Sequence, residues 1–423
     1  MSAVATSLPA GQVRSLVRGL TRRIPGTRTQ RVGNPGVSPG WRAYLIHTRS
    51  GQIGPGLDPV SGSWEIVLNG IESVTMTVRK RDLAGIERRW YSPWWGGVLL
   101  SFSDGAVETP VIAGPITGWG TENENSLQIK AKGLREIYRR LVLEEDLSPR
   151  DVSLGEIMWQ LAKAPASKPG GGLPVVDGCP DPHGRGHQRS YEAWNLANTG
   201  LDKLMSELSN VIGGPDVMFR PRVQKGDPRF LEWVVEHGTH LSPRIETGPI
   251  HDFDTTAVRA AVQEITVTTD ASALVSRVWA TGSGEGEGTR IARAEDLSLV
   301  KAGFPFLETV ISNPGTTTAP AAAASGEAGV RQEVPAGEEL AKLAGLAQGE
   351  LAARVDAVDQ ITVKVPVDHP TRGVDRLRVG DAAHVTVAGW LAVPDGTLRT
   401  RVVKLGGDLT GMMTVDFQED SWI

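Results

Sequence analysis

The spacing of apolar side chains changes its period along this chain, and this change is the strongest constraint on the fold. Short segments near both ends alternate apolar and polar residues, as strands with one buried face do. In two of these segments one face carries Val74, Met76 and Val78 or Leu127, Ile129 and Ala131, and the other carries Ser73, Thr75 and Thr77 or Gln128, Lys130 and Lys132. These patterns predict half-buried antiparallel strands.

Strand patterns occupy the first and last parts of the chain. Within residues 41–132 they also cover 42–48, 63–69, 97–102 and 110–117. They return at 262–268 and 274–281, within residues 256–312, and at 361–367, 383–388, 399–405 and 412–418, within residues 337–423. Short strands at such close spacing are typical of a small barrel or sandwich. We therefore expect a mainly β protein with two small β-barrel domains, and these could be related although no repeat of fixed period is present.

Residues 133–255 differ, because their apolar positions recur at helical spacing. After Gly133 the apolar face of a predicted helix consists of Leu134, Ile137, Tyr138, Leu141 and Val142. Ser153 precedes a second helix with Glu156 three residues on, which is the spacing of a capping box. A third helical region covers 190–211, and strands are predicted at 216–222 and 229–237. The middle of the chain is therefore expected to be an α+β domain inserted between β-rich segments.

Two segments have compositions that predict no packed core. Residues 1–40 are rich in Gly, Pro, Ser, Thr and Arg, and no acidic residue precedes Asp58, which indicates an extended basic arm. Residues 313–336 form an Ala/Pro/Gly-rich linker or loop. The linker leads into a predicted helix whose apolar face carries Leu340, Leu343, Ala344, Ala347, Leu351 and Val355.

Charge and cysteine content exclude several classes of protein. The formal net charge of -5 argues against a general nucleic-acid binder. Cys179 is the only cysteine, so no intrachain disulfide can form. The chain has no apolar run of the roughly 18 residues that a transmembrane helix needs, and its arginine-containing N-terminal segment has no continuous apolar stretch. We expect it to be neither secreted nor membrane-spanning.

One loop offers candidate metal ligands. Cys179, His183 and His187 have the spacing C-x3-H-x3-H, with Asp177 and Asp181 interleaved. A thiolate and two imidazoles can bind zinc. The Gly and Pro neighbours and the lack of a second ligand cluster are equally typical of a polar loop. Both interpretations stay open, and we assign no metal and no other cofactor.

No catalytic constellation is recognisable in the sequence. The neighbouring carboxylates Glu144, Glu145 and Asp146, or Glu419 and Asp420, are adjacent along the chain, whereas a glycosidase holds two carboxyls at a set separation across a cleft. The glycines at 282, 284, 286 and 288 invite comparison with a phosphate loop, but no Lys-Ser or Lys-Thr follows them, and Glu285 and Glu287 would repel a phosphate. We interpret this stretch as a strand connection and expect no enzymatic activity.

The densest aromatic cluster is R-R-W-Y-S-P-W-W-G-G, which contains Trp90, Tyr91, Trp94 and Trp95. Tryptophan and tyrosine supply large contact areas at low entropic cost, so the cluster can anchor a protein or stack on a sugar, of which we prefer the protein. The alternative is a core that closes a barrel.

Several loose motifs follow one another in a recognisable order. They are W-E-I-V-L-N-G-I-E-S-V-T-M-T-V-R-K-R-D, T-P-V-I-A-G-P-I-T-G-W, L-R-E-I-Y-R-R-L-V, V-W-A-T-G-S-G-E-G-E-G-T-R, L-R-V-G-D-A-A-H-V-T-V and R-V-V-K-L-G-G-D. In order and spacing, over residues 40–420, the chain resembles the tail hub family of siphophages. The resemblance is to minor tail proteins of phages that infect actinobacteria, which are related in fold to baseplate hub proteins of contractile tails.

The resemblance implies a structural protein of the virion tail tip, assembled in the bacterial cytoplasm. It implies a homotrimer in which two tail-tube-like barrel domains per subunit form a ring of pseudo-sixfold symmetry, decorated by peripheral α+β domains. The implied partners are a distal tail protein ring, a tape measure protein and tail fibre or spike proteins. Members of the family often carry hydrolase or receptor-binding modules after the hub core. Because this chain ends at Ile423, directly after its last predicted strand, we expect no such module.

The basic arm is a second candidate contact to a partner. An acidic surface on a neighbouring tail subunit would attract its arginines, Arg14, Arg18, Arg22, Arg23, Arg28 and Arg31. Ordering flexible residues costs roughly 1 kcal/mol apiece, so charge alone cannot hold the arm. Its apolar side chains, including Leu16 and Leu20, are therefore expected to dock as well. A contact to DNA or to a tape measure protein inside the tube is the alternative.

Two other classes of function remain open at this stage. A distal tail ring protein would be a hexamer, so the symmetry of the oligomer separates it from a hub. A carbohydrate-binding tail adhesin would place the tryptophan cluster at a sugar groove, so glycan binding tests that class. A hydrolase is the third alternative.

Overall fold

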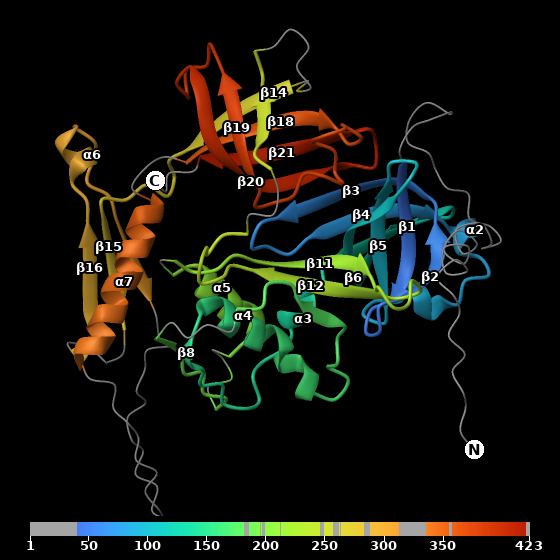
Figure 1. Ribbon diagram of the computed structural model, residues 1–423, viewed down its shortest axis with the longest axis horizontal. Helices are drawn as coiled ribbons and strands as arrows, with labels where there is room; N and C mark the ends of the chain where they lie inside the picture. The colour runs from blue at the N-terminus through green and yellow to red at the C-terminus, as the bar shows by residue number, and fades with distance from the viewer. Residues whose placement is uncertain are drawn as a thin grey trace, which may run out of the picture.

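The computed structural model describes residues 40–181, 186–194, 196, 199–211, 213–245, 249–256, 262, 264–282, 288–312, 336–354 and 358–419. Strands account for 45% of the chain and helices for 17%, which confirms the mainly β fold class (Figure 1). The predicted arm up to residue 39 and the linker at 313–335 lie outside the described residues.

The first strand unit is an antiparallel sheet with the order β3-β4-β7-β6-β5-β1-β2. Its strands are β1 (Gly40–His47), β2 (Gln52–Leu57), β3 (Pro59–Val67), β4 (Ser73–Arg79), β5 (Gly96–Ser103), β6 (Glu108–Glu122) and β7 (Ser126–Lys132). The short helix α2 (Lys80–Leu83) and the 3-10 helix η1 (Arg88–Tyr91) connect β4 to β5. Val74, Met76 and Val78 of β4 are buried and their neighbours are not, so the predicted alternation is confirmed.

The second strand unit has the order β14-β18-β21-β20-β19-β13. Its strands are β13 (His251–Asp254), β14 (Glu264–Asp270), β18 (Val358–Pro366), β19 (Ala382–Val387), β20 (Gly396–Asp408) and β21 (Met412–Glu419). The pairs are antiparallel except that between β13 and β19, which is parallel.

The two strand units are joined edge to edge by one antiparallel pair, β3 with β20. The register runs from Lys404 opposite Val67 to Asp408 opposite Ser63. Among the described strands, β2, β13 and β14 each pair with a single other strand. The predicted barrels are therefore open sheets in this part of the chain, and together they form one continuous sheet.

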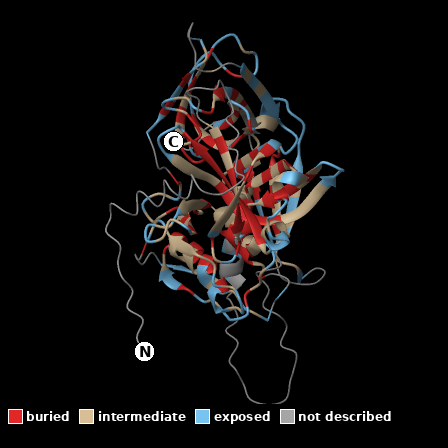
Figure 2. Ribbon diagram, turned by 90° about the vertical axis from the view of Figure 1, so that its right-hand side faces the viewer, coloured by how far each residue is buried: buried red, intermediate tan, exposed pale blue. Residues whose placement is uncertain are grey.

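The largest hydrophobic core contains buried residues of both strand units, and Figure 2 shows buried strands in the middle of the molecule. Two tryptophans of the first unit anchor the β20–β21 hairpin of the second. Trp41 donates its indole N–H to the carbonyl of Thr410 at 3.1 Å, and Trp64 donates to that of Asp408 at 3.3 Å. Their rings lie 5.2 Å apart. Large apolar side chains with a polar edge can thus fill a core and still satisfy their N–H groups.

The α+β unit lies beside the first strand unit (Figure 1). Its elements are α3 (Arg135–Tyr138), β8 (Arg150–Val152), α4 (Leu154–Lys163), the 3-10 helix η2 (Ala164–Ser167), β9 (Val175–Asp177), β10 (His187–Gln188), α5 (Leu201–Ser209), β11 (Val217–Val223) and β12 (Leu231–His237). Its core reaches β6, because the fully buried Trp233 donates its indole N–H to the carbonyl of Ala113 at 2.9 Å.

The predicted cap of the second helix is confirmed, since Ser153 Oγ accepts the backbone N–H of Glu156 at 3.0 Å. The helix predicted after Gly133 is much shorter than its pattern suggested. After α3 the backbone continues with i to i+3 hydrogen bonds such as Leu141 N to Tyr138 O. The helix predicted over 190–211 was also too long. Before α5 begins, Tyr191 forms a β-bridge with Leu147, and Gly200 forms one with Val142.

The inserted unit is held to both strand units through Asp216. Its carboxylate accepts hydrogen bonds from Asn69 Nδ2 at 2.8 Å and from the backbone N–H of Ile245 at 3.0 Å, and it forms an ion pair with Arg401. Asn69 has a φ of 58°, a conformation that Asn tolerates better than most residues, and its carbonyl accepts a 2.6 Å hydrogen bond from Arg135.

A small unit consists of a three-stranded sheet covered on one face by a helix. Its elements are β15 (Arg277–Thr281), β16 (Ile291–Glu295), α6 (Ser298–Lys301), β17 (Glu308–Ser312) and α7 (Ala336–Arg354). Leu343 and Ala347 of α7 are fully buried, as the predicted helix face requires, while Leu340 is exposed. Val355 lies outside the described residues. None of the described helices is both long and apolar enough to cross a membrane.

Candidate functional site

The predicted aromatic cluster lies in the connection between β4 and β5, where glycines let the rings approach the backbone. A Cβ atom on Gly96 would lie 1.9 Å from the carbonyl oxygen of Trp90. A Cβ atom on Gly54 would lie 2.3 Å from the ring of the same tryptophan. Trp94 has a φ of 68°, and its backbone N–H donates to the carbonyl of Ile116 on β6 at 2.8 Å. The loop is therefore tightly held against β2 and β6.

The four aromatic side chains divide between core and surface. Trp90 and Tyr91 are partly buried and pack against the main core. The ring of Trp95 lies 5.3 Å from that of Trp90, edge to face, and 4.4 Å from that of His47. Trp94 is 41% exposed. Three of the four rings are therefore partly buried and only Trp94 is exposed, so both interpretations of the cluster stay predictions.

Arginines lie over the aromatic rings of this region. The guanidinium carbons of Arg88, Arg89 and Arg140 are 5.3 to 5.4 Å from ring centroids. Each such contact contributes roughly 0.5–1 kcal/mol at an exposed site. We call this region the aromatic–arginine surface; it consists of Arg88, Arg89, Trp94, Trp95, Trp119 and Arg140. Trp and Arg side chains are enriched among the central interface residues that contribute most of the binding energy between proteins.

The electrostatics of the aromatic–arginine surface favour an acidic or neutral partner. Partial burial, followed by the nearby charges of Arg49 and Arg89, lowers the pKa of His47. The imidazole is therefore neutral at pH 7, and the positive charge of the surface comes from its arginines. Arg89 is paired with Glu87 at 2.6 Å. Sequence reasoning did not include Arg140 and Trp119 in the cluster, because neither residue lies near it in sequence.

The candidate metal ligands are only partly described. Cys179 follows β9, and its backbone N–H donates to the carboxylate of Asp177 at 2.9 Å. His187 lies in β10 and is exposed, and His183 lies outside the described residues. No group of three His, Cys, Asp or Glu side chains suited to a metal is found among the residues that the structure places. The three-residue site therefore stays a prediction.

Two histidines that sequence reasoning missed hold this loop instead. His237 directs Nε2 to Asp177 Oδ1 at 3.2 Å and Nδ1 to the carbonyl of Gly238 at 2.9 Å. His240 directs Nδ1 to Asp181, which also accepts the backbone N–H of His240 at 2.6 Å. Burial raises the pKa of the Cys179 thiol. Because both nitrogens of His237 are directed at other groups, His237 does not serve as the base that a cysteine nucleophile needs.

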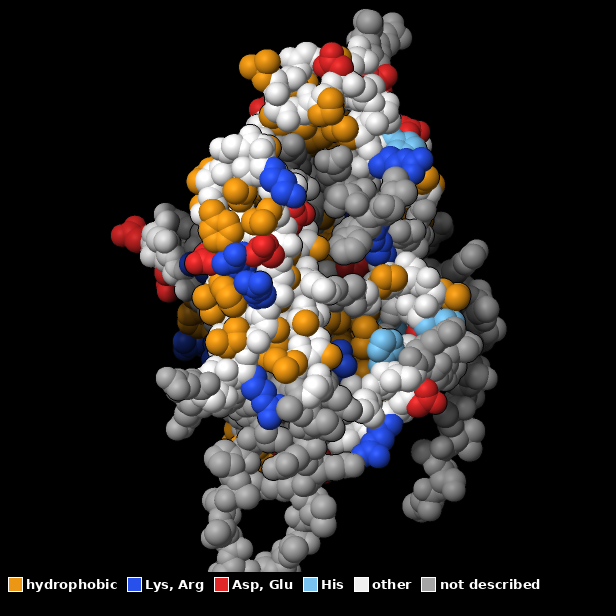
Figure 3. All heavy atoms as spheres, turned by 90° about the vertical axis from the view of Figure 1, so that its left-hand side faces the viewer, with side chains coloured by type: hydrophobic (Ala, Val, Ile, Leu, Met, Phe, Trp, Pro, Cys, Tyr) orange, Lys and Arg blue, Asp and Glu red, His pale blue; other side chains and the backbone are white. Residues whose placement is uncertain are grey.

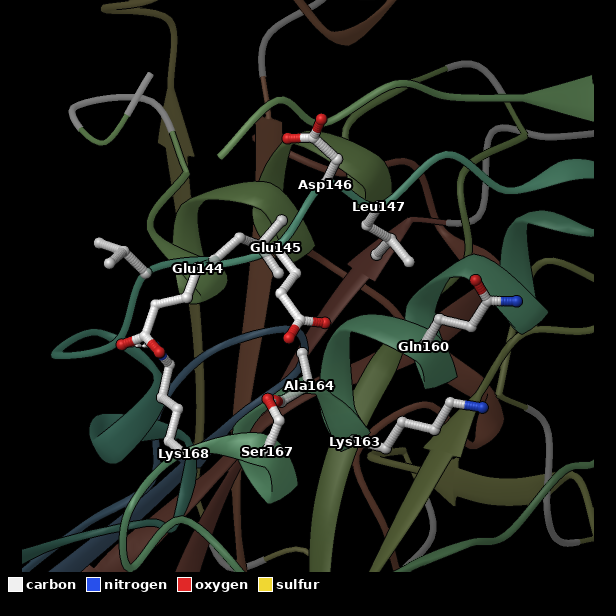
Figure 4. A pocket seen from close by; sticks show the side chains of 11 residues that line it. Glu144, Glu145, Asp146, Leu147, Gln160, Lys163, Ala164, Ser167 and Lys168 are labelled. Carbon is white, nitrogen blue, oxygen red and sulfur yellow. Dashed lines mark hydrogen bonds and ion pairs between the residues drawn. The ribbon is translucent and has the colours of Figure 1, made fainter. Parts of the chain in front are cut away.

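A hollow of about 270 Å³ lies between residues 142–147 and the end of α4 (Figure 4). The three neighbouring carboxylates that the sequence offered, Glu144, Glu145 and Asp146, lie on its rim. Glu144 is exposed and forms a 2.5 Å ion pair with Lys168, and Asp146 accepts the backbone N–H of Ala193 at 2.8 Å. A glycosidase acid is a carboxyl kept protonated by an apolar site or by a neighbouring charge. Glu144, Glu145 and Asp146 are instead all exposed, which fits solvated surface charges.

The small unit carries a second exposed apolar surface, on the face of its sheet away from α7. Figure 3 looks at this side of the molecule and shows hydrophobic side chains among basic and acidic ones. Arg277 lies between the rings of Trp279 and Phe306, with its guanidinium 5.5 and 4.6 Å from their centroids. Val310 and Phe304 are exposed nearby. The alternation of Trp279 with the buried Val278 and Ala280 was the signal that could have indicated this surface.

Comparison with known proteins identifies the fold. No protein-family model and no curated protein matches the sequence. The tail protein from Neisseria meningitidis MC58 is 15% identical, covers 90% of this chain and 97% of its own, and superposes with a TM-score of 0.52. The 43 kDa tail protein of prophage MuSo2 from Shewanella oneidensis is 11% identical, covers 90% of this chain and 98% of its own, and gives a TM-score of 0.53. The chain therefore has the fold of these tail proteins.

Proposed function

We propose that this protein is a structural tail hub, which closes the distal end of a phage tail tube and links the tube to fibres or a spike. The observation that carries the proposal is the match in fold to two tail proteins. The match covers 90% of this chain and almost the whole length of each of those two proteins. The match extends through both strand units and the insertions between them, so it concerns the arrangement of the whole chain. An origin in a phage of actinobacteria, which the sequence resemblance implied, stays a prediction.

The proposed hub is non-enzymatic. The carboxylates at the hollow are exposed, the pKa of the only thiol is raised, and both ring nitrogens of His237, in the neighbouring strand, are directed at other groups. These arrangements support a structural role, in which the surfaces rather than a reactive group carry the function. Its place is the virion tail tip.

The proposed assembly is a homotrimer. Each chain has two strand units with corresponding strand order, so three chains supply the six units that a sixfold tail tube requires. The proposed neighbours are a distal tail protein ring, a tape measure protein and fibre or spike proteins. The aromatic–arginine surface and the six arginines of the basic arm are the proposed contacts to them.

Electron microscopy of the assembled tail tests the proposal directly. We expect three copies of the chain at the tube's distal end, and a native mass of three chains for the purified tip component. Six copies would support the distal tail ring protein instead. Specific binding of the isolated chain to host glycans would support the adhesin, and clearing of host cell walls by the pure protein would show a hydrolase.

The proposed contacts need separate variants. Trp94→Ala removes the most exposed ring of the aromatic–arginine surface, and deletion of residues 2–36 removes the arm. We expect both proteins to fold and to enter tails poorly, as judged by incorporation into particles in a complementation assay. Trp194→Ala, which also removes an exposed tryptophan but in the α+β unit, is the matched control. Normal incorporation of either variant would remove that surface from the proposal.

A further inference from the structure

Two arginines of the aromatic–arginine surface lie over tryptophan rings and form no ion pair with any described residue. The guanidinium carbon of Arg88 is 5.4 Å from the ring centroid of Trp119, and that of Arg140 is 5.3 Å from the ring centroid of Trp94. Both arginines are exposed, and no described residue accepts a hydrogen bond from either guanidinium. Their charges are therefore held at fixed places and are not neutralised within this part of the chain.

Contact with a ring leaves the hydrogen-bond donors of a guanidinium available to a partner. A tryptophan ring offers no oxygen that accepts a hydrogen bond, so the five N–H donors of each arginine still need acceptors. The contact also limits the conformations of a long side chain, so less entropy is lost when a partner binds it. A carboxylate fits such a donor set best, because its two oxygens accept two parallel N–H bonds from one guanidinium.

The charge of the aromatic–arginine surface selects an acidic partner. Its third arginine, Arg89, pairs with Glu87 at 2.6 Å, and this is the one ion pair that the three arginines form with residues the structure describes. The positive charges of Arg88 and Arg140 are uncompensated there. A partner that buries the surface must supply negative charge, because an arginine that loses its water without gaining a counter-charge is strongly destabilising.

Trp94 supplies an apolar anchor beside these charges. Its side chain is 41% exposed, while its backbone N–H is bound to the carbonyl of Ile116 at 2.8 Å. A tryptophan offers a large contact area and loses little conformational entropy when it is bound. The surface therefore suits a segment in which an apolar side chain lies next to carboxylates.

We propose that the aromatic–arginine surface binds an acidic segment of a neighbouring tail protein, with one carboxylate on Arg88, another on Arg140 and an apolar side chain on Trp94. The inference rests on the proposed function, in that it names the chemistry of the partner at one of the contacts proposed there. Nucleic acid fits this surface less well. Binding through a phosphate backbone relies on many basic contacts, on the order of 6–10, whereas the surface offers two uncompensated arginines in a chain of net charge -5.

Two double variants that differ only in charge test the proposal. Arg88→Gln with Arg140→Gln removes both positive charges, and Arg88→Glu with Arg140→Glu replaces them by negative charges on side chains of nearly the same volume. Both variants lose the same contacts with the rings, so a difference between them reports the charge of the partner. Arg81→Glu with Arg150→Glu changes the net charge equally at two exposed arginines outside this surface and is the matched control.

We expect the full-length Glu double variant to enter tails at least about tenfold less often than the Gln double variant in the complementation assay, because like charges in a contact repel each other. The control should be incorporated as well as wild type. Equal incorporation of the Glu and Gln variants would overturn the acidic partner. Circular dichroism of the purified proteins checks that each variant is folded, and a Glu double variant that does not fold is replaced by comparing Arg140→Glu with Arg140→Gln.

Selection for restored infectivity in the presence of the Glu double variant identifies the partner. We expect suppressors that change an Asp or Glu of another tail protein to Lys or Arg. Suppressors that arise only within this chain would contradict the proposal. A nucleic-acid contact is tested by fluorescence anisotropy with a labelled oligothymidylate of about 20 nucleotides at about 150 mM salt. We expect no binding to wild type, and binding that the Gln double variant loses would show a nucleic-acid surface instead.

The number of wild-type chains in the tail tip separates this inference from the proposed function. Three chains, together with equal incorporation of the Glu and Gln variants, would leave the hub standing and overturn the acidic partner. Six chains would overturn the hub, and the charge dependence of incorporation would then decide the acidic partner by itself.

Discussion

The carboxylate of Asp216 forms an ion pair with the guanidinium of Arg401, which is 185 residues further along the chain. Both side chains are largely buried. The same carboxylate accepts hydrogen bonds from Asn69 and Ile245, so segments from both strand units and from the α+β unit meet at one residue. This contact holds the inserted unit in place against the two sheets.

Replacing Asp216 by Ala should therefore destabilise the protein strongly. Removing one partner of a buried pair leaves Arg401 as an uncompensated charge, which typically costs about 3–5 kcal/mol. We expect a decrease of about that size in the free energy of unfolding, measured by urea denaturation. Glu144→Ala, which removes an exposed member of an ion pair, should cost less than about 1 kcal/mol. Equal effects of the two substitutions would show that Asp216 does not act as a junction.

The stability of the protein should depend on the ionisation of Glu72. Complete burial, opposed in part by a backbone hydrogen bond and by Arg135 and Arg220, raises the pKa of this carboxyl to about 7. Its Oε2 atom has no hydrogen-bond partner among the described residues, and a Cβ atom on Gly133 would lie 1.8 Å from it. A folded-state pKa above the unfolded value means that the folded protein binds the extra proton, so stability is lost as the pH rises from about 4.5 to about 7.

Glu72→Gln should remove this dependence, because the amide does not titrate. We expect the variant to gain up to roughly 3 kcal/mol relative to wild type between pH 5 and pH 8, measured by urea denaturation at each pH. Comparing the two proteins cancels the contributions of other carboxylates. A difference between wild type and variant that is constant with pH would contradict the prediction.

Gly96→Ala should disturb the aromatic–arginine surface. The added methyl group would lie 1.9 Å from the Trp90 carbonyl oxygen, so the backbone between η1 and β5 must move. Overpacking of this kind typically costs 1–3 kcal/mol. We expect a loss of about 2 kcal/mol together with a changed near-ultraviolet circular dichroism spectrum, which reports the packing of tryptophans. Gly226→Ala, where a Cβ atom would meet nothing within 4 Å, should change neither quantity by more than experimental error.

Cys179 should react slowly with thiol reagents in the folded protein. Burial raises the pKa of its thiol, and the nearby carboxylates of Glu236 and Asp177 act in the same direction. Only the thiolate reacts with these reagents, and the raised pKa keeps the thiolate population at pH 8 small. We expect labelling by iodoacetamide to be at least about tenfold slower than for the same chain in urea. Equal rates would show that the loop after β9 is open in solution.

Local patterns predicted the strands and one helix start well. The alternation of Val74, Met76 and Val78 identified a face that is buried, and Ser153 with Glu156 identified the start of α4. Local patterns failed where a distant partner decides the outcome. Arg135 is not part of the apolar face predicted for its helix, yet it is only 2% exposed, because Asp202 and the carbonyl of Asn69 accept hydrogen bonds from its guanidinium. The aromatic cluster was found from its composition, whereas Arg140 and Trp119 join it only through the folding of the chain.

By itself, the sequence determined the mainly β class, because the side-chain period of a strand is a property of neighbouring residues. Only the tertiary structure decided that β20 pairs with β3 and that Asp216 meets Arg401. Those contacts join residues that are far apart in sequence. No local pattern encodes them, because a strand's hydrogen-bonding edge is the same whatever its sequence, and its partner is chosen by the path of the chain between them.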